Sequence, residues 1–295
     1  MNEFHLRLPA TSANLGPGFD ALALALKLYL YVDAEPASWM TVEATGRSAD
    51  ICGATENNLL IETYREILAA HGRELIPLQL NVQNEIPLGM GCGSSAAVRL
   101  AALALASHFG DLDWSRDRIL AEAARLEGHP DNAAACWLGG LVASAVEGDR
   151  VRAISIAPPA LWRAVIVMPD QPMATSASRG MLPESYTRKD VVANLQRVAL
   201  LTAAFAAEDA DVMATAMADR LHQPFRADAC PLLPRLLPLA GNDGIAGVAL
   251  SGAGPAVLLL TVSEEAALVA RNLAARRLDG LGKVEFLTCE LENTL

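Results

Sequence analysis

The chain has 295 residues and a formal net charge of −11, from 23 basic and 34 acidic side chains. This length favours two domains with a sizeable core, and the small number of basic residues argues against nucleic acid or an anionic membrane as a partner. Five cysteines, an odd number at irregular spacing, are typical of reduced thiols in the cytoplasm and not of a disulfide framework. Because Glu3 and Arg7 interrupt the first residues, we expect no signal peptide.

The first half of the chain predicts helices and one strand. Apolar residues at helical spacing predict a helix over residues 58–71, and strict alternation of apolar and polar residues predicts a half-buried strand over 78–83. An alanine- and leucine-rich segment over 95–109 predicts a second helix that ends at Gly110, and residues 115–126 predict a third, amphipathic helix.

A composition shift at Pro158-Pro159 suggests a boundary between domains of residues 1–157 and 158–295. Beyond it we expect a mixture of strands and one helix. The strands are predicted over 164–168, 247–250 and 257–262, and the helix over 191–207.

The stretch 244–263 is uncharged and about long enough to cross a membrane, which takes roughly 20 residues. Its Gly252-Ala-Gly-Pro255 interruption is typical of a turn after a strand, so we reject a membrane span.

The segment Pro87–Ala97 is a glycine-rich loop that leads into a helix. Glycines at alternate positions allow the backbone to approach a polyanion, and the helix directs free N–H groups and its dipole to the same point. The dinucleotide-binding pattern fits poorly because Ser94 replaces its third glycine, and the lysine-containing phosphate loop is excluded because the segment has no lysine. A turn that only caps a helix remains the alternative.

Two further glycine segments, Pro9–Asp20 and Leu250–Val257, accompany this loop in a fixed order. Together the three segments resemble those of the GHMP kinases, named for galactokinase and the homoserine, mevalonate and phosphomevalonate kinases. The sequence of residues 9–20, together with the motif Glu127-Gly-His-Pro-Asp-Asn132, is most similar to the corresponding motifs of the homoserine kinases.

The resemblance implies an α+β fold with a ribosomal protein S5 domain 2-like N-terminal domain and a ferredoxin-like C-terminal domain, with the site in the cleft between them. It also implies a cytoplasmic homodimer that phosphorylates the small molecule L-homoserine in threonine biosynthesis, using ATP and Mg²⁺. Residues matching the family's ATP site are Asn57, Asn58, Pro87, Leu88, Gly89, Met90, Gly91, Cys92, Gly93, Ser94, Ser95, Gly252 and Gly254. Asn57 and Asn58 also suit a turn and helix cap.

Ser95 and Glu127 match the family's metal ligands. Mg²⁺ takes one or two protein oxygens and keeps several waters, so a hydroxyl and a carboxylate are enough. Helix capping by Ser94 and Ser95 is compatible with this role, and the alternative for Glu127 is a solvated carboxylate at a helix end.

The substrate site implied by the family match comprises Asn14, Asp20, His129, Asn132, Thr175, Arg179 and Arg226. An aspartate can pair with the substrate ammonium group, and a guanidinium suits the carboxylate because it presents two parallel donors. The alternatives are a tight turn at residues 14–18 and arginines on the surface. His129 is not expected to bind a metal, because no second His or Cys lies at ligand spacing.

The catalytic residues implied are Asp131, Asn132 and Arg179. Asp131 is either a general base or a group that orients Asn132, and both roles stay open. Two departures from the family pattern, Cys92 and Ala253, are small: we expect Cys92 to pack beneath the loop as a small hydrophobe.

Three other functions fit the sequence less well. A GHMP kinase acting on mevalonate or a related alcohol fits less well, because Asp20, Arg179 and Arg226 suit a zwitterion. A catalytically inactive ATP-binding sensor is disfavoured by the presence of both Ser95 and Glu127, and a structural protein without a nucleotide site by the three glycine segments.

Overall fold

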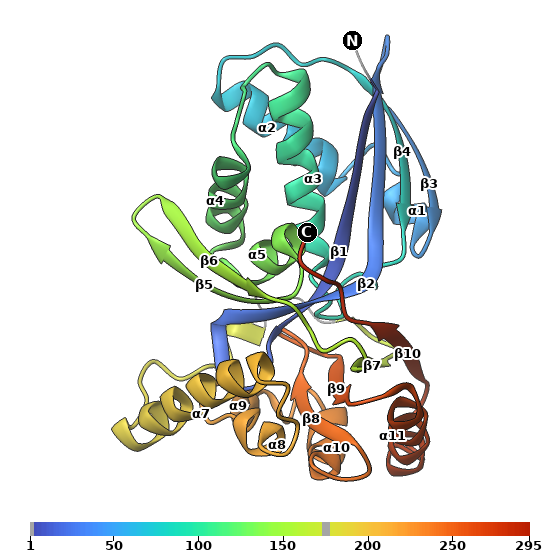
Figure 1. The fold of residues 1–295 in the computed structure, drawn as a ribbon. Helices are drawn as coiled ribbons and strands as arrows, with labels where there is room; N and C mark the ends of the chain where they lie inside the picture. Colours follow the sequence, from blue (N-terminus) through green and yellow to red (C-terminus); the bar gives the residue numbers. More distant parts are fainter. Residues whose placement is uncertain (1–2, 173–177) are drawn as a thin grey trace.

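The computed structural model describes residues 3–172 and 178–295, which form two β-sheets with helices packed against them (Figure 1). The strands are β1 Phe4–Asn14, β2 Gly18–Pro36, β3 Thr41–Gly46, β4 Leu78–Asn84, β5 Leu141–Glu147, β6 Arg150–Ile156, β7 Arg163–Pro169, β8 Ile245–Leu250, β9 Val257–Thr261 and β10 Val284–Glu290.

The helices cover residues from both halves of the chain. They are α1 Ala49–Cys52, α2 Leu59–Ala70, α3 Ser94–Phe109, α4 Arg116–Glu127, α5 Asp131–Leu138, α7 Arg188–Ala206, α8 Met213–Ala216, α9 Gln223–Arg226, α10 Leu232–Leu236, the 3₁₀ helix η1 Leu237–Leu239 and α11 Glu264–Arg277.

The first sheet has the strand order β3-β4-β2-β5-β6, with β1 paired to β2. Strand β4 alternates buried and exposed residues as predicted, and the predicted helices are confirmed as α2, α3 and α4. Helices α3 and α5 pack on β1 and β2, where alanine-rich faces allow a close approach to the sheet.

The second sheet is antiparallel with the order β10-β7-β9-β8. Its βαββαβ element sequence is that of a ferredoxin-like domain, as predicted. The predicted strand at 164–168 is β7 and the predicted helix at 191–207 is α7.

The uncharged stretch 244–263 contains β8 and β9, in which every residue is buried. Burial on both faces explains the lack of charge without a membrane. Within the described residues, no helix is long and apolar enough to cross a bilayer.

The β1–β2 hairpin brings the N-terminal turn to the second sheet (Figure 1). Gly252 N–H donates to the Ala13 carbonyl at 3.1 Å, and Asn14 Nδ2 donates to the Gly252 carbonyl at 2.9 Å. The two sheets therefore meet at this turn. The suggested domain boundary at Pro158-Pro159 falls between β6 and β7 and stays a prediction.

Candidate active site

Two cavities of about 250 Å³ each share Ser94 and Ser95, the first residues of α3. Predicted residues that line the first cavity are Asn14, Asp20, Gly89, Gly91, Cys92, Gly93, Ser94, Ser95, Glu127, His129, Asp131, Asn132, Arg179, Arg226 and Gly252. Those that line the second are Asn57, Asn58, Leu88, Ser94 and Ser95.

Four predicted residues are not among the described lining residues. Pro87, Met90 and Gly254 lie in or beside the loop without lining either cavity. Met90 accepts a hydrogen bond from Ala256 N–H through its carbonyl, and Gly254 packs behind Gly91. Thr175 lies outside the described residues.

The glycine-rich loop needs its glycines for both conformation and space. Gly91 and Gly93 have φ of 81° and 71°, in the left-handed region. A Cβ on Gly91 would lie 2.1 Å from the Ser251 carbonyl oxygen, and one on Gly93 would lie 1.9 Å from Thr11 Oγ1. The loop is thus held against both sheets while its backbone faces the first cavity.

The N-terminus of α3 offers free N–H groups to an anion. Its N-cap is Gly93, and no side chain caps it. Ser95 instead donates to Glu127 Oε1 at 2.7 Å, so its hydroxyl points across the cavity and the helix-capping alternative is not what the structure shows.

Ser95 and Glu127 form an oxygen pair suited to Mg²⁺. The Glu127 side chain is only 10% exposed, and its Oε1 lies 3.1 Å from Arg99 Nη1, so the solvated-glutamate alternative is wrong. A hydroxyl and a carboxylate side by side, next to the glycine-rich loop, match the hard oxygen ligands that this ion takes. The donor set therefore fits the metal predicted from the sequence.

The second cavity is mainly apolar and lies beside the loop. Asn58 caps α2: its Oδ1 accepts from Leu60 N and Ile61 N, and its Nδ2 donates to the Cys52 and Ala54 carbonyls. The cap alternative is therefore confirmed for Asn58, although the residue also lines the cavity. An apolar cavity of this kind suits the flat aromatic base of a nucleotide.

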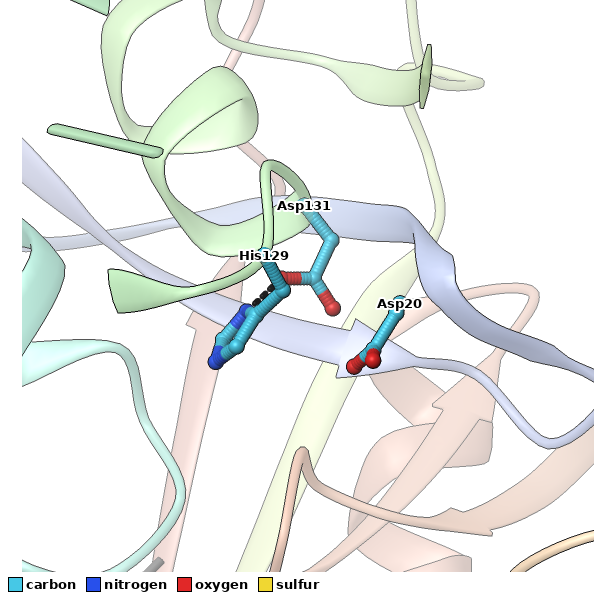
Figure 2. Close-up of side chains that lie close together, drawn as sticks. All are labelled: Asp20, His129 and Asp131. Atoms are coloured by element: carbon cyan, nitrogen blue, oxygen red, sulfur yellow. Dashed lines mark hydrogen bonds and ion pairs between the residues drawn. The ribbon is translucent and has the colours of Figure 1, made fainter. Parts of the chain in front are cut away.

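His129, Asp131 and Asp20 converge on the first cavity, with one polar atom of each within 4.8 Å of the others (Figure 2). His129 Nδ1 lies 2.5 Å from Asp131 Oδ1, which also accepts from Asn132 N–H at 2.7 Å. Burial alone would lower the pKa of His129, but the hydrogen bond and charge of Asp131 outweigh it and raise the pKa. This group places two carboxylates and an imidazole on the wall of the first cavity.

Asn132 is oriented by a residue that was not predicted. Thr11 Oγ1 donates to Asn132 Oδ1 at 2.6 Å, which leaves the amide nitrogen of Asn132 to donate elsewhere.

Arg179 and Arg226 lie at the same end of the cavity. Arg179 pairs with both oxygens of Asp20, and Asp20 N–H donates to Asn14 Oδ1 at 3.1 Å. Arg226 is 1% exposed, so the surface alternative is wrong for it. Burial and the nearby Arg179 lower the pKa of Arg226, whereas the charge of Asp20 acts in the opposite direction.

Sequence reasoning missed Phe19, which also lines the first cavity, and His222, which contacts Arg226 from behind it. Both guanidinium carbons lie 5.5 Å from the centre of the Phe19 ring. His222 lies four residues before Arg226, a spacing that places two side chains on one face of a helix and could have pointed to it.

Cys92 is 1% exposed, and burial raises the pKa of its thiol to about 12. It packs under the loop as a small hydrophobe, as expected. All five cysteines are free thiols. At the other departure from the family pattern, Ala253 lines the first cavity and its carbonyl accepts from Ser178 Oγ at 2.9 Å.

Comparison with known proteins agrees with this geometry. The GHMP kinases N terminal domain matches residues 58–140, and the GHMP kinases C terminal domain matches residues 201–279. Homoserine kinase of Solibacter usitatus is 46% identical over 259 residues, covering 87% of this chain and 84% of that protein. Homoserine kinase of Moorella thermoacetica is 38% identical, covering 86% of each chain.

The fold also matches solved structures. Homoserine kinase from Cytophaga hutchinsonii superposes with a TM-score of 0.83, covering 99% of this chain and 96% of that chain at 24% identity. The expected resemblance and fold class are both confirmed: the chain belongs to the GHMP kinase family and has its two-domain α+β fold.

Proposed function

We propose that this protein is a homoserine kinase, which transfers the γ-phosphoryl group of ATP to the side-chain hydroxyl of L-homoserine. The observation that carries the proposal is the first cavity, which has a phosphate-binding loop at one end and paired acidic and guanidinium groups at the other. Such a cavity suits a zwitterionic amino acid placed next to a polyphosphate. The names of the curated relatives support the same substrate.

The nucleotide is assigned to both cavities. The base fits the apolar second cavity, and the phosphates fit the loop of residues 89–93 and the N-terminus of α3. Ser95 and Glu127 would hold Mg²⁺, which neutralises charge on the β- and γ-phosphates when bound.

The amino acid is assigned to the charged end of the first cavity. Its carboxylate would meet Arg179 and Arg226, and its ammonium group would meet Asp20. Asn14 orients Asp20 through the hydrogen bond to its backbone. These contacts turn the hydroxyl of the substrate toward the loop.

Asn132 and Asp131 are assigned to the reacting hydroxyl. The Asn132 amide nitrogen is free to donate, because Thr11 occupies its oxygen. Asp131 holds His129 and the Asn132 backbone through Oδ1, which supports an orienting role, and a role as proton acceptor would use its other oxygen. The transfer breaks the bond between the γ-phosphorus and the bridging oxygen, which leaves with ADP, and forms a new P–O bond to the substrate oxygen. The hydroxyl proton passes to the transferred phosphoryl group or, if Asp131 is the base, to its free oxygen.

We infer a cytoplasmic homodimer in threonine biosynthesis from the same family resemblance. The oligomeric part of this inference is tested by light scattering of the purified protein.

The test of the function is ADP release by the purified protein with ATP and magnesium, in parallel reactions with L-homoserine, mevalonate, galactose and no acceptor. Turnover with homoserine alone supports the proposal. Turnover with mevalonate or galactose would assign the cavity to another alcohol. ATP binding without turnover on any acceptor would indicate a sensor.

A further inference from the structure

Three buried polar side chains in contact with one another lie behind the substrate end of the first cavity. They are Asp219, His222 and Arg226, and only the last of these lines the cavity. The side chains of Asp219 and His222 are fully buried, at 0% exposure. Buried polar groups of this kind are costly unless their hydrogen bonds are satisfied, so their partners define their state.

The hydrogen bonds of His222 fix its tautomer. Nε2 lies 2.8 Å from the Gly16 carbonyl oxygen, which can only accept, so Nε2 carries a hydrogen. Nδ1 lies 3.0 Å from Arg226 Nη1, which can only donate, so Nδ1 presents a lone pair. His222 is therefore a neutral imidazole. Burial lowers its pKa, and the charge of Arg226 acts in the same direction against that of Asp219.

Asp219 fixes the backbone that carries His222. Its two oxygens accept from three successive backbone N–H groups, those of residues 221, 222 and 223, at 2.7 to 2.9 Å. Asn194 Nδ2 donates to the same carboxylate at 2.8 Å. The backbone that carries the imidazole is thus held in place at the beginning of α9.

The other partner of His222 belongs to the N-terminal turn. Gly16 lies between Asn14 and Asp20, and a Cβ at Gly16 would lie 1.9 Å from the Met217 carbonyl oxygen, so the turn is packed tightly. One imidazole therefore joins Arg226 to the turn that carries Asp20. Phe19 packs against the same group, with its ring 5.3 Å from that of His222.

We propose that His222 is a positioning residue for the substrate carboxylate: its neutral imidazole accepts from Arg226 at Nδ1 and donates to Gly16 at Nε2, and so holds the guanidinium in a fixed place relative to Asp20. The identity of that substrate rests on the proposed function. A guanidinium that is already oriented loses less conformational entropy when a carboxylate binds.

The variants His222→Asn and His222→Gln each keep one of the two hydrogen bonds of the imidazole and remove the other. In His222→Asn the side-chain oxygen can occupy the place of Nδ1 and accept from Arg226, whereas in His222→Gln the longer amide reaches the place of Nε2 and can donate to Gly16. We expect the Gln variant to raise KM for L-homoserine by about 10-fold or more, the effect of losing a hydrogen bond to a charged group, and the Asn variant to raise it several-fold less. KM for ATP should stay within about two-fold in both, since His222 lines neither of the two cavities assigned to the nucleotide. Equal KM values for homoserine in the two variants, or a parallel rise in KM for ATP, would overturn the proposal.

Coupling to Arg226 gives a second measurement. In an Arg226→Ala background, His222→Gln should raise KM for homoserine no further, because its effect passes through the guanidinium. A full additional increase contradicts the proposal. Thermal unfolding of each variant identifies any that fail to fold.

The imidazole tautomer can be read without any acceptor. Long-range ¹H–¹⁵N spectra of the wild-type protein should show His222 with a protonated Nε2 and an unprotonated Nδ1 at neutral pH; the opposite tautomer or an imidazolium contradicts the proposal. If the wild-type protein phosphorylates another alcohol instead of homoserine, the proposed function fails while the spectra and the Asn–Gln comparison, run with that alcohol, still decide the role of His222.

Discussion

Arg179 donates from both terminal nitrogens to Asp20, at 2.7 Å to Oδ1 and 3.1 Å to Oδ2. The two side chains are 38% and 31% exposed and line the first cavity. When an amino acid binds, its carboxylate can pair with Arg179 and its ammonium group can pair with Asp20. A ligand that has only one of the two charges leaves the other partner without a replacement.

This relationship predicts a change of selectivity in Asp20→Asn. The variant should lose more kcat/KM with L-homoserine than with 4-hydroxybutyrate, which lacks the ammonium group, by about 10-fold, because only the first substrate uses the charge of Asp20. Steady-state kinetics with both acceptors measure the difference.

Asp190→Asn is the matched control. Asp190 pairs with Arg220 at 3.3 Å, with exposures of 33% and 39%, at the start of α7. It should leave the selectivity between the two acceptors unchanged. An equal loss for both acceptors in Asp20→Asn would remove the ammonium assignment.

A second prediction concerns the space around Gly91. Gly91 and Gly280 have nearly the same φ, 81° and 83°, but a Cβ meets the Ser251 carbonyl at 2.1 Å only at Gly91, whereas nothing lies within 4 Å at Gly280. Gly280→Ala should therefore cost only the left-handed conformation, about 1 to 2 kcal/mol of the free energy of unfolding. Gly91→Ala should cost more and also weaken ATP binding, because the loop must shift away from Ser251.

Chemical denaturation and ATP titration test the pair. If Gly91→Ala binds ATP as the wild-type protein does, the loop does not depend on this close approach.

The regular spacing of apolar residues predicted the helices and the strand that bury only one face. Strand β4 and helices α2, α3 and α4 follow from alternation or helical periodicity, and each was found within a few residues of its predicted bounds. The β1–β2 hairpin was read only as a turn. Strand β2 pairs with β1, β4 and β5 along its length, and such long-range pairing leaves no period that a short window can show.

The site residues were predicted from sequence motifs. Their hydrogen-bond partners could not be predicted in this way, because these partners lie in segments that are distant in the sequence. Asn14 binds the Gly252 carbonyl across 238 positions, and Thr11 binds Asn132 across 121. His222 was missed because its four-residue spacing to Arg226 indicates a shared helix face but does not reveal which groups the imidazole binds. Its role is visible only once Gly16 and Arg226 are seen on either side of the ring.

Ser95→Ala should separate ATP binding from turnover. Ser95 Oγ bonds Glu127, so its loss removes one metal oxygen and one anchor of the carboxylate, and kcat should fall by about 100-fold while the affinity for ATP changes little. Ser94→Ala is the control, since Ser94 borders both cavities without being assigned to the metal, and it should lose less than about 10-fold. Rate against magnesium concentration should show a higher requirement in the Ser95 variant alone; equal requirements in both variants would contradict the metal assignment.

The last prediction concerns the pH dependence of stability. Burial, together with the charge of Arg226, lowers the pKa of folded His222 below its ordinary value near 6.5, although Asp219, Asp20 and the Gly16 carbonyl act in the opposite direction. Below pH 6.5 the unfolded chain therefore binds a proton at this position that the folded protein does not bind. The free energy of unfolding contributed by His222 is full above pH 6.5 and falls as the pH drops toward the folded pKa.

Denaturant unfolding at pH 7.5 and 5.5 checks this sign in the wild-type protein and in His222→Asn, whose side chain does not titrate. The wild-type protein should lose about 1 kcal/mol more stability over this range than the variant does. If the two lose the same amount, His222 takes up a proton in the folded state, and an imidazolium has no lone pair with which to accept a hydrogen bond from Arg226.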